Sequence, residues 1–183
     1  MIRLKPLKRL KGIPPIKRRR RDKADPIPGG EYVTEDEPHV NEIFIRLGRR
    51  SRDLRVAKRV AKLVEQFPNA TIPELVTMDW LNQQNIEYKY LAQVLGGHAR
   101  KGGVEADFLL QVGGVGMVWL INGNYWHSRP EVVASDVVDR LRFIGATRYG
   151  IRIEKVVALW ERRIYEDRPT VFELALAGVE MGM

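Results

Sequence analysis

The sequence contains no cysteine and only three histidines. Without thiols the chain can form neither a disulfide framework nor a cysteine-ligated zinc site, so no structural zinc is expected. The absence of cysteine also suits a reducing compartment. The chain has no run of about 18 apolar residues, and its basic N-terminus lacks the apolar stretch and small-residue cleavage site of a secretory signal. We therefore expect a cytoplasmic protein with no membrane partner.

Positive charge dominates the chain, which has 183 residues and a net charge of +8, but the charge is unevenly distributed. Residues 1–23 hold eleven Lys and Arg against one Asp, and residues 46–62 hold eight Lys and Arg against one Asp. Residues 24–45 hold six acids and no Lys or Arg, whereas residues 63–183 have a net charge of −3. A polyanion such as DNA would therefore be bound mainly by the two basic segments.

Residues 1–50 have the composition of an extended arm rather than of a folded unit. Six prolines interrupt any regular element: Pro6, Pro14, Pro15, Pro26, Pro28 and Pro38. Between them lies a block of five basic residues: Lys17, Arg18, Arg19, Arg20 and Arg21. Apolar residues are regularly spaced around this block: Ile2, Leu4, Leu7, Leu10, Ile13 and Ile16. Such an arm suits binding to nucleic acid or to a large assembly, and the basic block alone would also fit a localisation signal or a solvated run.

The pattern of apolar residues over 51–183 predicts a single α/β domain. Helices are expected over 51–66, 71–85 and 128–143, and strands over 87–94, 105–112, 116–122 and 154–160. The segment from Arg162 onward is mixed, with 171–176 either helical or extended. Gly113-Gly114 is expected to turn two strands into a hairpin, and Thr71-Ile72-Pro73-Glu74 is a capping box. The first helix has a basic face suited to phosphate contacts: Arg52, Arg55, Lys58, Arg59 and Lys62.

Two neighbouring motifs carry the residues best suited to chemistry. Asp107 starts the apolar run Asp107-Phe108-Leu109-Leu110, and His127 ends the turn Asn122-Gly123-Asn124-Tyr125-Trp126-His127 after the next strand. A carboxylate that can hold a metal ion, beside a histidine that can transfer a proton, is the minimum for metal-assisted phosphodiester hydrolysis. The alternatives are a carboxylate that caps a strand end and a histidine in a surface turn.

The order of these elements and motifs resembles the core of the PD-(D/E)XK nuclease superfamily, and in particular the very short patch repair endonucleases. The resemblance covers about residues 70–162. It rests on Pro73-Glu74, on the Asp107 strand, on the Asn122–His127 turn and on Leu159-Trp160-Glu161. It implies a restriction-endonuclease-like fold with the order α-β-β-β-α-β and a small mixed sheet flanked by helices. It also implies a magnesium- or manganese-dependent DNA endonuclease that is bacterial or phage-encoded.

The resemblance implies roles for individual residues as well. Asp107 and the backbone carbonyl of Ile121 would bind the metal ion, and His127 and Glu74 would support proton transfer. Tyr125 and Trp126 would press into the DNA base stack, although packing between sheet and helix is the commoner use of such a tryptophan. Glu74 is explained equally well as the return partner of its capping box.

Other residues near these motifs have two interpretations each. Arg100 and Lys101 lie in the glycine-rich loop 96–103, which either cradles a phosphate through its backbone N–H groups or is a plain surface loop. Asn122 can offer an amide oxygen to a metal ion or to water. A turn residue that tolerates positive φ explains Asn122 better.

The sequence departs from the family pattern at several positions. Asn122 replaces the usual histidine or acid, Ala106 replaces the usual proline, and no Glu-X-Lys follows on the second hairpin strand. The part of the predicted domain after its first helix, residues 63–183, is slightly acidic, while the arm alternates basic and apolar residues. The alternative is therefore a catalytically inactive protein that has kept the nuclease fold. Its arm would anchor it as a structural or adaptor protein in a large assembly such as a phage particle.

Overall fold

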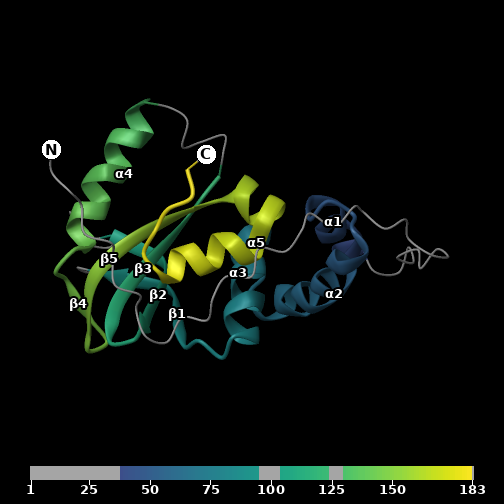
Figure 1. Ribbon diagram of the computed structural model, residues 1–183, viewed down its shortest axis with the longest axis horizontal. Helices are drawn as coiled ribbons and strands as arrows, with labels where there is room; N and C mark the ends of the chain where they lie inside the picture. Colours follow the sequence, from purple (N-terminus) through teal and green to yellow (C-terminus); the bar gives the residue numbers. More distant parts are fainter. Residues whose placement is uncertain (1–37, 95–103, 124–129, 183) are drawn as a thin grey trace, which may run out of the picture.

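The computed structural model describes residues 38–94, 104–123 and 130–182, and Figure 1 shows how their elements are arranged. Three helices begin this part of the chain: α1 (Pro38–Arg46), α2 (Ser51–Gln66) and α3 (Ile72–Gln83). Helix α2 has the predicted bounds, and α3 ends slightly earlier than predicted. None of the helices in the described ranges is long and apolar enough to cross a bilayer.

Helix α1 lies in the segment 1–50 that was expected to belong to the arm, and its apolar residues pack in the core. Pro38 starts the helix, where the missing N–H of proline removes no helical hydrogen bond. Val40, Ile43 and Leu47 form a buried stripe that packs in the same core as α2 and α3. This apolar stripe, rather than the acidic and proline-rich composition around it, makes α1 part of the folded domain.

The sheet has five strands: β1 (Tyr88–Val94), β2 (Val104–Val112), β3 (Val115–Asn122), β4 (Thr147–Arg148) and β5 (Ile151–Trp160). Their spatial order is β1-β2-β3-β5-β4. Neighbouring strands are antiparallel except for β3 and β5, which are parallel and are connected through α4 (Pro130–Phe143). The predicted α/β class is confirmed, with a mixed sheet whose parallel pair needs the helical crossover.

Glycine shapes the predicted hairpin between β2 and β3. Gly113 and Gly114 form its turn with φ values of 59° and 86°, a left-handed conformation that favours glycine. Two residues later, a Cβ on Gly116 would lie 2.0 Å from the backbone carbonyl oxygen of Arg152. The register between β3 and β5 shifts between Gly116 and Met117. Only glycine permits this close approach, which lets β3 run alongside β5.

The last helix, α5 (Glu161–Leu176), was predicted only as a mixed segment. It bends at Asp167, whose φ and ψ are −149° and 66°. Pro169 explains the bend, because proline lacks the N–H that would continue the helical ladder and disfavours helical backbone just before it. The bend divides α5 into an arginine-rich first half and an apolar second half.

The sheet is covered on both faces. Helices α1, α2, α3 and α5 enclose the larger core, which contains Phe108, Trp119 and Phe172. Helix α4 covers the opposite face through Phe143, beside Leu109 and Val118 of the strands. In Figure 1, α1 and α2 lie together at the end of the molecule away from β4. The candidate site lies where β2 and β3 leave the larger core.

Candidate functional site

Several predicted site residues lie outside the described part of the chain. These are the basic block Lys17–Arg21, the loop residues Arg100 and Lys101, and the turn residues Tyr125, Trp126 and His127. The structure describes the other candidates: Glu74, Asp107, Ile121, Asn122 and the basic residues of α2. The described part of the predicted site therefore contains its two carboxylates, Glu74 and Asp107, but not its histidine.

Asp107 stands where β2 and β3 separate. The ladder between these strands extends from Val112 and Val115 to the pair of Phe108 and Trp119. One residue further along β2, the Oδ2 atom of Asp107 accepts the backbone N–H of Ile121 at 2.6 Å. The carboxylate therefore takes the place of a main-chain acceptor at the point where the ladder ends. This position brings the two predicted metal ligands, Asp107 and Ile121, together.

The carbonyl of Ile121 lies on the same side of β3 as its N–H group. In a regular β-strand, the N–H and the C=O of one residue point to the same side and form hydrogen bonds with the same neighbouring strand. Because the N–H of Ile121 points to Asp107, its carbonyl oxygen faces the β2 side as well. A carboxylate and a carbonyl that face one gap are suited to share one hard cation.

Strands β1 and β2 both change face at this point. Phe108 and Tyr90 pack in the larger core, whereas Ala106 and Ala92, two residues away on the same strands, pack under α4. Leu91, between Tyr90 and Ala92, has a φ of 47°. A left-handed conformation at a leucine costs about 1–2 kcal/mol. The local strain lies directly beside Asp107, as is common where a backbone presents a functional group.

Glu74 forms the predicted capping box at the start of α3. Its Oε2 atom accepts the backbone N–H of Thr71 at 2.6 Å and the Thr71 hydroxyl at 2.8 Å. The hydroxyl of Tyr90 donates to the same oxygen at 3.3 Å. The Glu74 side chain is buried. Its structural role is therefore confirmed, while a role in proton transfer stays a prediction.

Tyr90 is a site residue that the sequence did not indicate. Burial raises the pKa of its hydroxyl, and the negative fields of Glu74, Asp107 and Glu105 raise it further. The hydroxyl thus stays protonated among three carboxylates and donates to one of them. Its ring packs edge-on against Phe67, with centroids 5.6 Å apart. No motif marks this tyrosine, and only the pairing of β1 with β2 would have placed it near Asp107.

An open pocket of about 550 Å³ adjoins the end of β3. Its lining comes mainly from α1, α3, β3 and α5 and includes His39, Glu42, Arg46, Glu74, Ile121 and Glu161. Arg46 lies between two of the acids. Its Nη2 atom is 3.3 Å from Oε1 of Glu42, and its Nη1 atom is 3.8 Å from Oε1 of Glu161. Ile121 both lines this pocket and donates its N–H to Asp107. The pocket therefore gives access to the end of β3 from the α1 side.

The Asp107 carboxylate and the Ile121 carbonyl fit a magnesium site that has few protein ligands. Within the described ranges, no cluster of three or more His, Cys, Asp or Glu side chains could hold a metal ion. Magnesium, however, commonly uses one or two carboxylates and completes its shell with water and substrate phosphate. Asp107 and the Ile121 carbonyl supply the one carboxylate and one further oxygen that such a site needs. The described residues do not supply enough side chains to surround a metal ion with protein ligands alone.

Asn122 ends β3 and pairs in parallel with Trp160 of β5. It is only 5% exposed, and its backbone is not among the left-handed residues of the described chain. The positive φ that would favour a turn asparagine is therefore absent here. The residue is instead part of the strand, where an amide group cannot act as a base.

The basic face of α2 divides into two groups. Arg59 makes a bidentate pair with Asp79 of α3 at 2.7 and 2.8 Å, and this hydrogen-bonded carboxylate raises the pKa of the guanidinium. Its guanidinium therefore joins two helices of the domain, and a phosphate contact through Arg59 stays a prediction. Arg55, Lys58 and Lys62 are exposed, as a nucleic-acid-binding face would require.

The sequence matches no protein-family model, and searches of curated proteins and of solved structures gave no match. The interpretation of the site therefore rests on its own residues. These combine a metal-competent carboxylate at the divergence of two strands with a buried Glu–Tyr pair beside it.

Proposed function

We propose that the chain is a metal-dependent DNA endonuclease of the PD-(D/E)XK type with a restriction-endonuclease-like core. The order of α3, β1, β2, β3, α4 and β5 supports this proposal, because it follows the α-β-β-β-α-β order of that core, with the two-residue strand β4 inserted before β5. The antiparallel β1-β2-β3 unit joined to a parallel β5 supports it as well. The proposal concerns the fold family and the activity together.

The observation that carries the proposal is the position of Asp107. A carboxylate that only capped a strand end could face solvent at either edge of the sheet. The Asp107 carboxylate instead accepts the N–H of Ile121 at 2.6 Å, in the gap between two central strands. A cation bound in this gap would be shared by the carboxylate and the Ile121 carbonyl.

Each residue then has a defined task. Asp107 and the Ile121 carbonyl would hold the magnesium ion, which supplies an activated water and neutralises charge on the phosphate when bound. Tyr90 donates its hydroxyl to Oε2 of Glu74 and so positions that carboxylate. Because Oε2 of Glu74 already accepts three hydrogen bonds, proton transfer by Glu74 would use Oε1. The proposed proton transfer by His127 is independent of these contacts.

DNA would be held mainly by charge. The exposed residues Arg55, Lys58 and Lys62 form one face of α2, and the basic arm supplies further contacts. Phosphate contacts of this kind carry no sequence information and weaken steeply as salt increases. We therefore expect binding to plain duplex DNA that weakens strongly between low and physiological salt.

Cleavage of plasmid and mismatched duplex DNA in Mg²⁺ or Mn²⁺ tests the proposal, with Asp107→Asn as the key variant. Its amide oxygen can still accept the N–H of Ile121, so the fold should be kept while the charge is lost. Glu105→Gln is the matched control, because it removes a carboxylate from the same strand. We expect Asp107→Asn to lower the cleavage rate by at least about a hundredfold. DNA binding, measured by mobility shift, should change little.

The nuclease proposal would be refuted if wild-type protein cut no DNA under any metal condition. It would also fail if Glu105→Gln lost as much activity as Asp107→Asn. In either case the Asp107 position would carry no specific chemistry.

A second candidate function is a structural or adaptor protein that has kept the nuclease fold without its activity. The buried, strand-paired Asn122 favours this alternative, because it holds a neutral amide where relatives of the proposed family hold a histidine or an acid. In that case deletion of residues 1–30 would block assembly with the partner particle, and Asp107→Asn would change nothing.

A further inference from the structure

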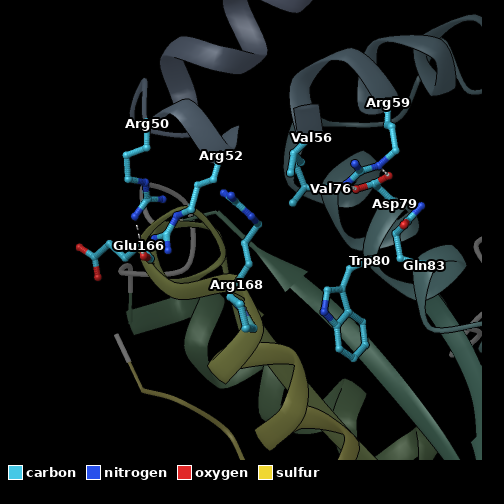
Figure 2. Close-up of a pocket in the computed structure, with 11 residues that line it drawn as sticks. Arg50, Arg52, Val56, Arg59, Val76, Asp79, Trp80, Gln83, Glu166 and Arg168 are labelled. Carbon is cyan, nitrogen blue, oxygen red and sulfur yellow. Dashed lines mark hydrogen bonds and ion pairs between the residues drawn. The ribbon is translucent and has the colours of Figure 1, made fainter. Parts of the chain in front are cut away.

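A second pocket, of about 250 Å³, is lined by side chains of α2, α3 and α5. Figure 2 shows Arg50, Arg52 and Arg168 gathered on one side and the Arg59–Asp79 pair with Trp80 on the other. The site at Asp107 shares none of these residues. None of the motifs in the sequence pointed to this pocket, because its arginines come from distant parts of the chain.

The lining of this pocket carries an excess of positive charge. Four arginines stand against two buried carboxylates, Asp53 behind the wall and Asp79 within it. Asp53 is shared by Arg50 and Arg168, and Asp79 is held by Arg59. The remaining acid in the lining, Glu166, is paired outward with Arg162 and Arg163 at 2.7 and 3.1 Å. The pocket is therefore more positive than these acids can balance.

Two of these arginines have hydrogen-bond donors that no described residue accepts. Arg168 binds Asp53 through Nη2, and its Nη1 atom is buried with no hydrogen-bond partner among the described residues. A buried guanidinium N–H without an acceptor costs free energy, so a small shift of this side chain that brings Nη1 to an anionic occupant of the pocket is favoured. Arg52 makes no hydrogen bond or ion pair with any described residue and lines the same pocket.

The rest of the wall is largely apolar. Val56, Val76, Pro169 and the indole of Trp80 line it. Trp80 is fixed from behind by Phe172, with ring centroids 4.9 Å apart. An indole held in this way offers a rigid face on which a planar ring can stack. The pocket thus combines a cationic corner with an aromatic wall.

We propose that this pocket binds the phosphomonoester of a nucleotide, with the phosphate at Arg52 and Arg168 and the base toward Trp80. Guanidinium groups bind phosphate oxygens through paired, charge-assisted hydrogen bonds. The volume of about 250 Å³ accommodates a phosphate group and part of a nucleoside, and it is too small for a duplex. The nucleotide is either free or the 5′-phosphorylated end of a single strand. This proposal does not depend on cleavage.

Titration calorimetry of the full chain with adenosine 5′-monophosphate, supported by Trp fluorescence, tests the proposal. Arg52→Gln removes one proposed contact, and it should leave the fold intact because Arg52 has no described partner. Arg152→Gln is the control, since it makes the same substitution at an exposed position of β5 that is outside both the pocket lining and the basic face of α2. We expect Arg52→Gln to weaken binding by about tenfold or more and Arg152→Gln by less than about twofold.

Further ligands separate the two sources and the rival explanations. Binding of a 5′-phosphorylated oligonucleotide, with loss of binding for the same strand lacking the phosphate, would identify a strand end. Binding of the mononucleotide alone would identify a free nucleotide. Equal losses in both variants, equal affinity for adenosine without phosphate, or no saturable binding would each overturn the proposal.

Discussion

Replacement of Glu74 separates its structural role from its proposed chemical role. In the structure, Oε2 of Glu74 accepts two hydrogen bonds from Thr71 and one from Tyr90. Glu74→Ala removes all three, whereas Glu74→Gln keeps a neutral acceptor oxygen in the same place. The two variants therefore differ in stability for reasons that can be worked out from these contacts.

The expected loss of stability follows from the exposure of each donor. Loss of a helix cap costs about 0.5–2 kcal/mol, and here the Thr71 donors are exposed and can turn to water. The Tyr90 hydroxyl is half-buried and loses a charged acceptor, which adds about 1–2 kcal/mol. We therefore expect Glu74→Ala to lower the free energy of unfolding by about 2–3 kcal/mol. Glu74→Gln should cost about 1 kcal/mol, because only the charge is lost.

Urea unfolding followed by tryptophan fluorescence measures both values, since Trp119 and Trp80 lie in the core against which α3 packs. A cost below about 0.5 kcal/mol for Glu74→Ala would show that the cap bonds contribute nothing, and the reasoning would be refuted. Activity is compared at a temperature where both variants are folded. If Glu74→Gln is folded and cuts DNA at the wild-type rate, Glu74 is a cap and takes no part in proton transfer.

Two further predictions concern buried groups of the same domain. Asp53→Asn should lower the free energy of unfolding by about 3–5 kcal/mol, because the fully buried carboxylate pairs with both Arg50 and Arg168. Asp139→Asn is the control in the same urea assay. It breaks an exposed ion pair with Arg142 and should cost less than about 1 kcal/mol. Because the folded pKa of Tyr90 is raised, its contribution to stability is present below the ordinary tyrosine pKa of about 10 and is lost as pH rises above it. Unfolding at about pH 9 and 11 should therefore show a smaller alkaline loss in Tyr90→Phe than in wild type, and an equal loss would contradict this assignment.

The strands and most helices could be predicted from the sequence because their signals are local. The Gly113-Gly114 turn and the flanking apolar residues identified the hairpin, and the capping box identified the start of α3. Helix α1 could not be predicted in this way. Its segment is acidic and starts at a proline, and only burial of Val40 and Ile43 against distant helices shows that it belongs to the domain.

Residues of the site were predictable where one side chain carried the signal. Asp107 was identified by its place before an apolar run, and its contact with Ile121 agrees with the expected proximity of the two residues. The ion-pair partner of Arg59 was not predictable, because Asp79 is twenty residues away and on another helix. A helical pattern predicts which face is basic, but it does not predict which of those cations is already paired.

The arginine pocket depends on contacts at still longer range. Arg168 reaches Asp53 across 115 residues, and it does so because Pro169 bends α5 at that point. A charge run in sequence would suggest a solvated surface, whereas the bend buries one guanidinium. Sites of this kind can only be recognised once the bent helix is packed against α2.

Helix α3 is held by a polar anchor at each end, and this bears on how both proposals are tested. Most residues of this helix are buried, and its apolar residues are not confined to one face, so apolar packing alone would fix its rotation only weakly. Glu74 anchors its start through Thr71 and Tyr90, and Asp79 anchors its end through Arg59. Glu74 faces the proposed metal site, and Asp79 and Trp80 face the arginine pocket. A variant at either anchor can therefore shift the whole helix, so only substitutions that preserve stability, such as Asp107→Asn and Arg52→Gln, can assign function to either site.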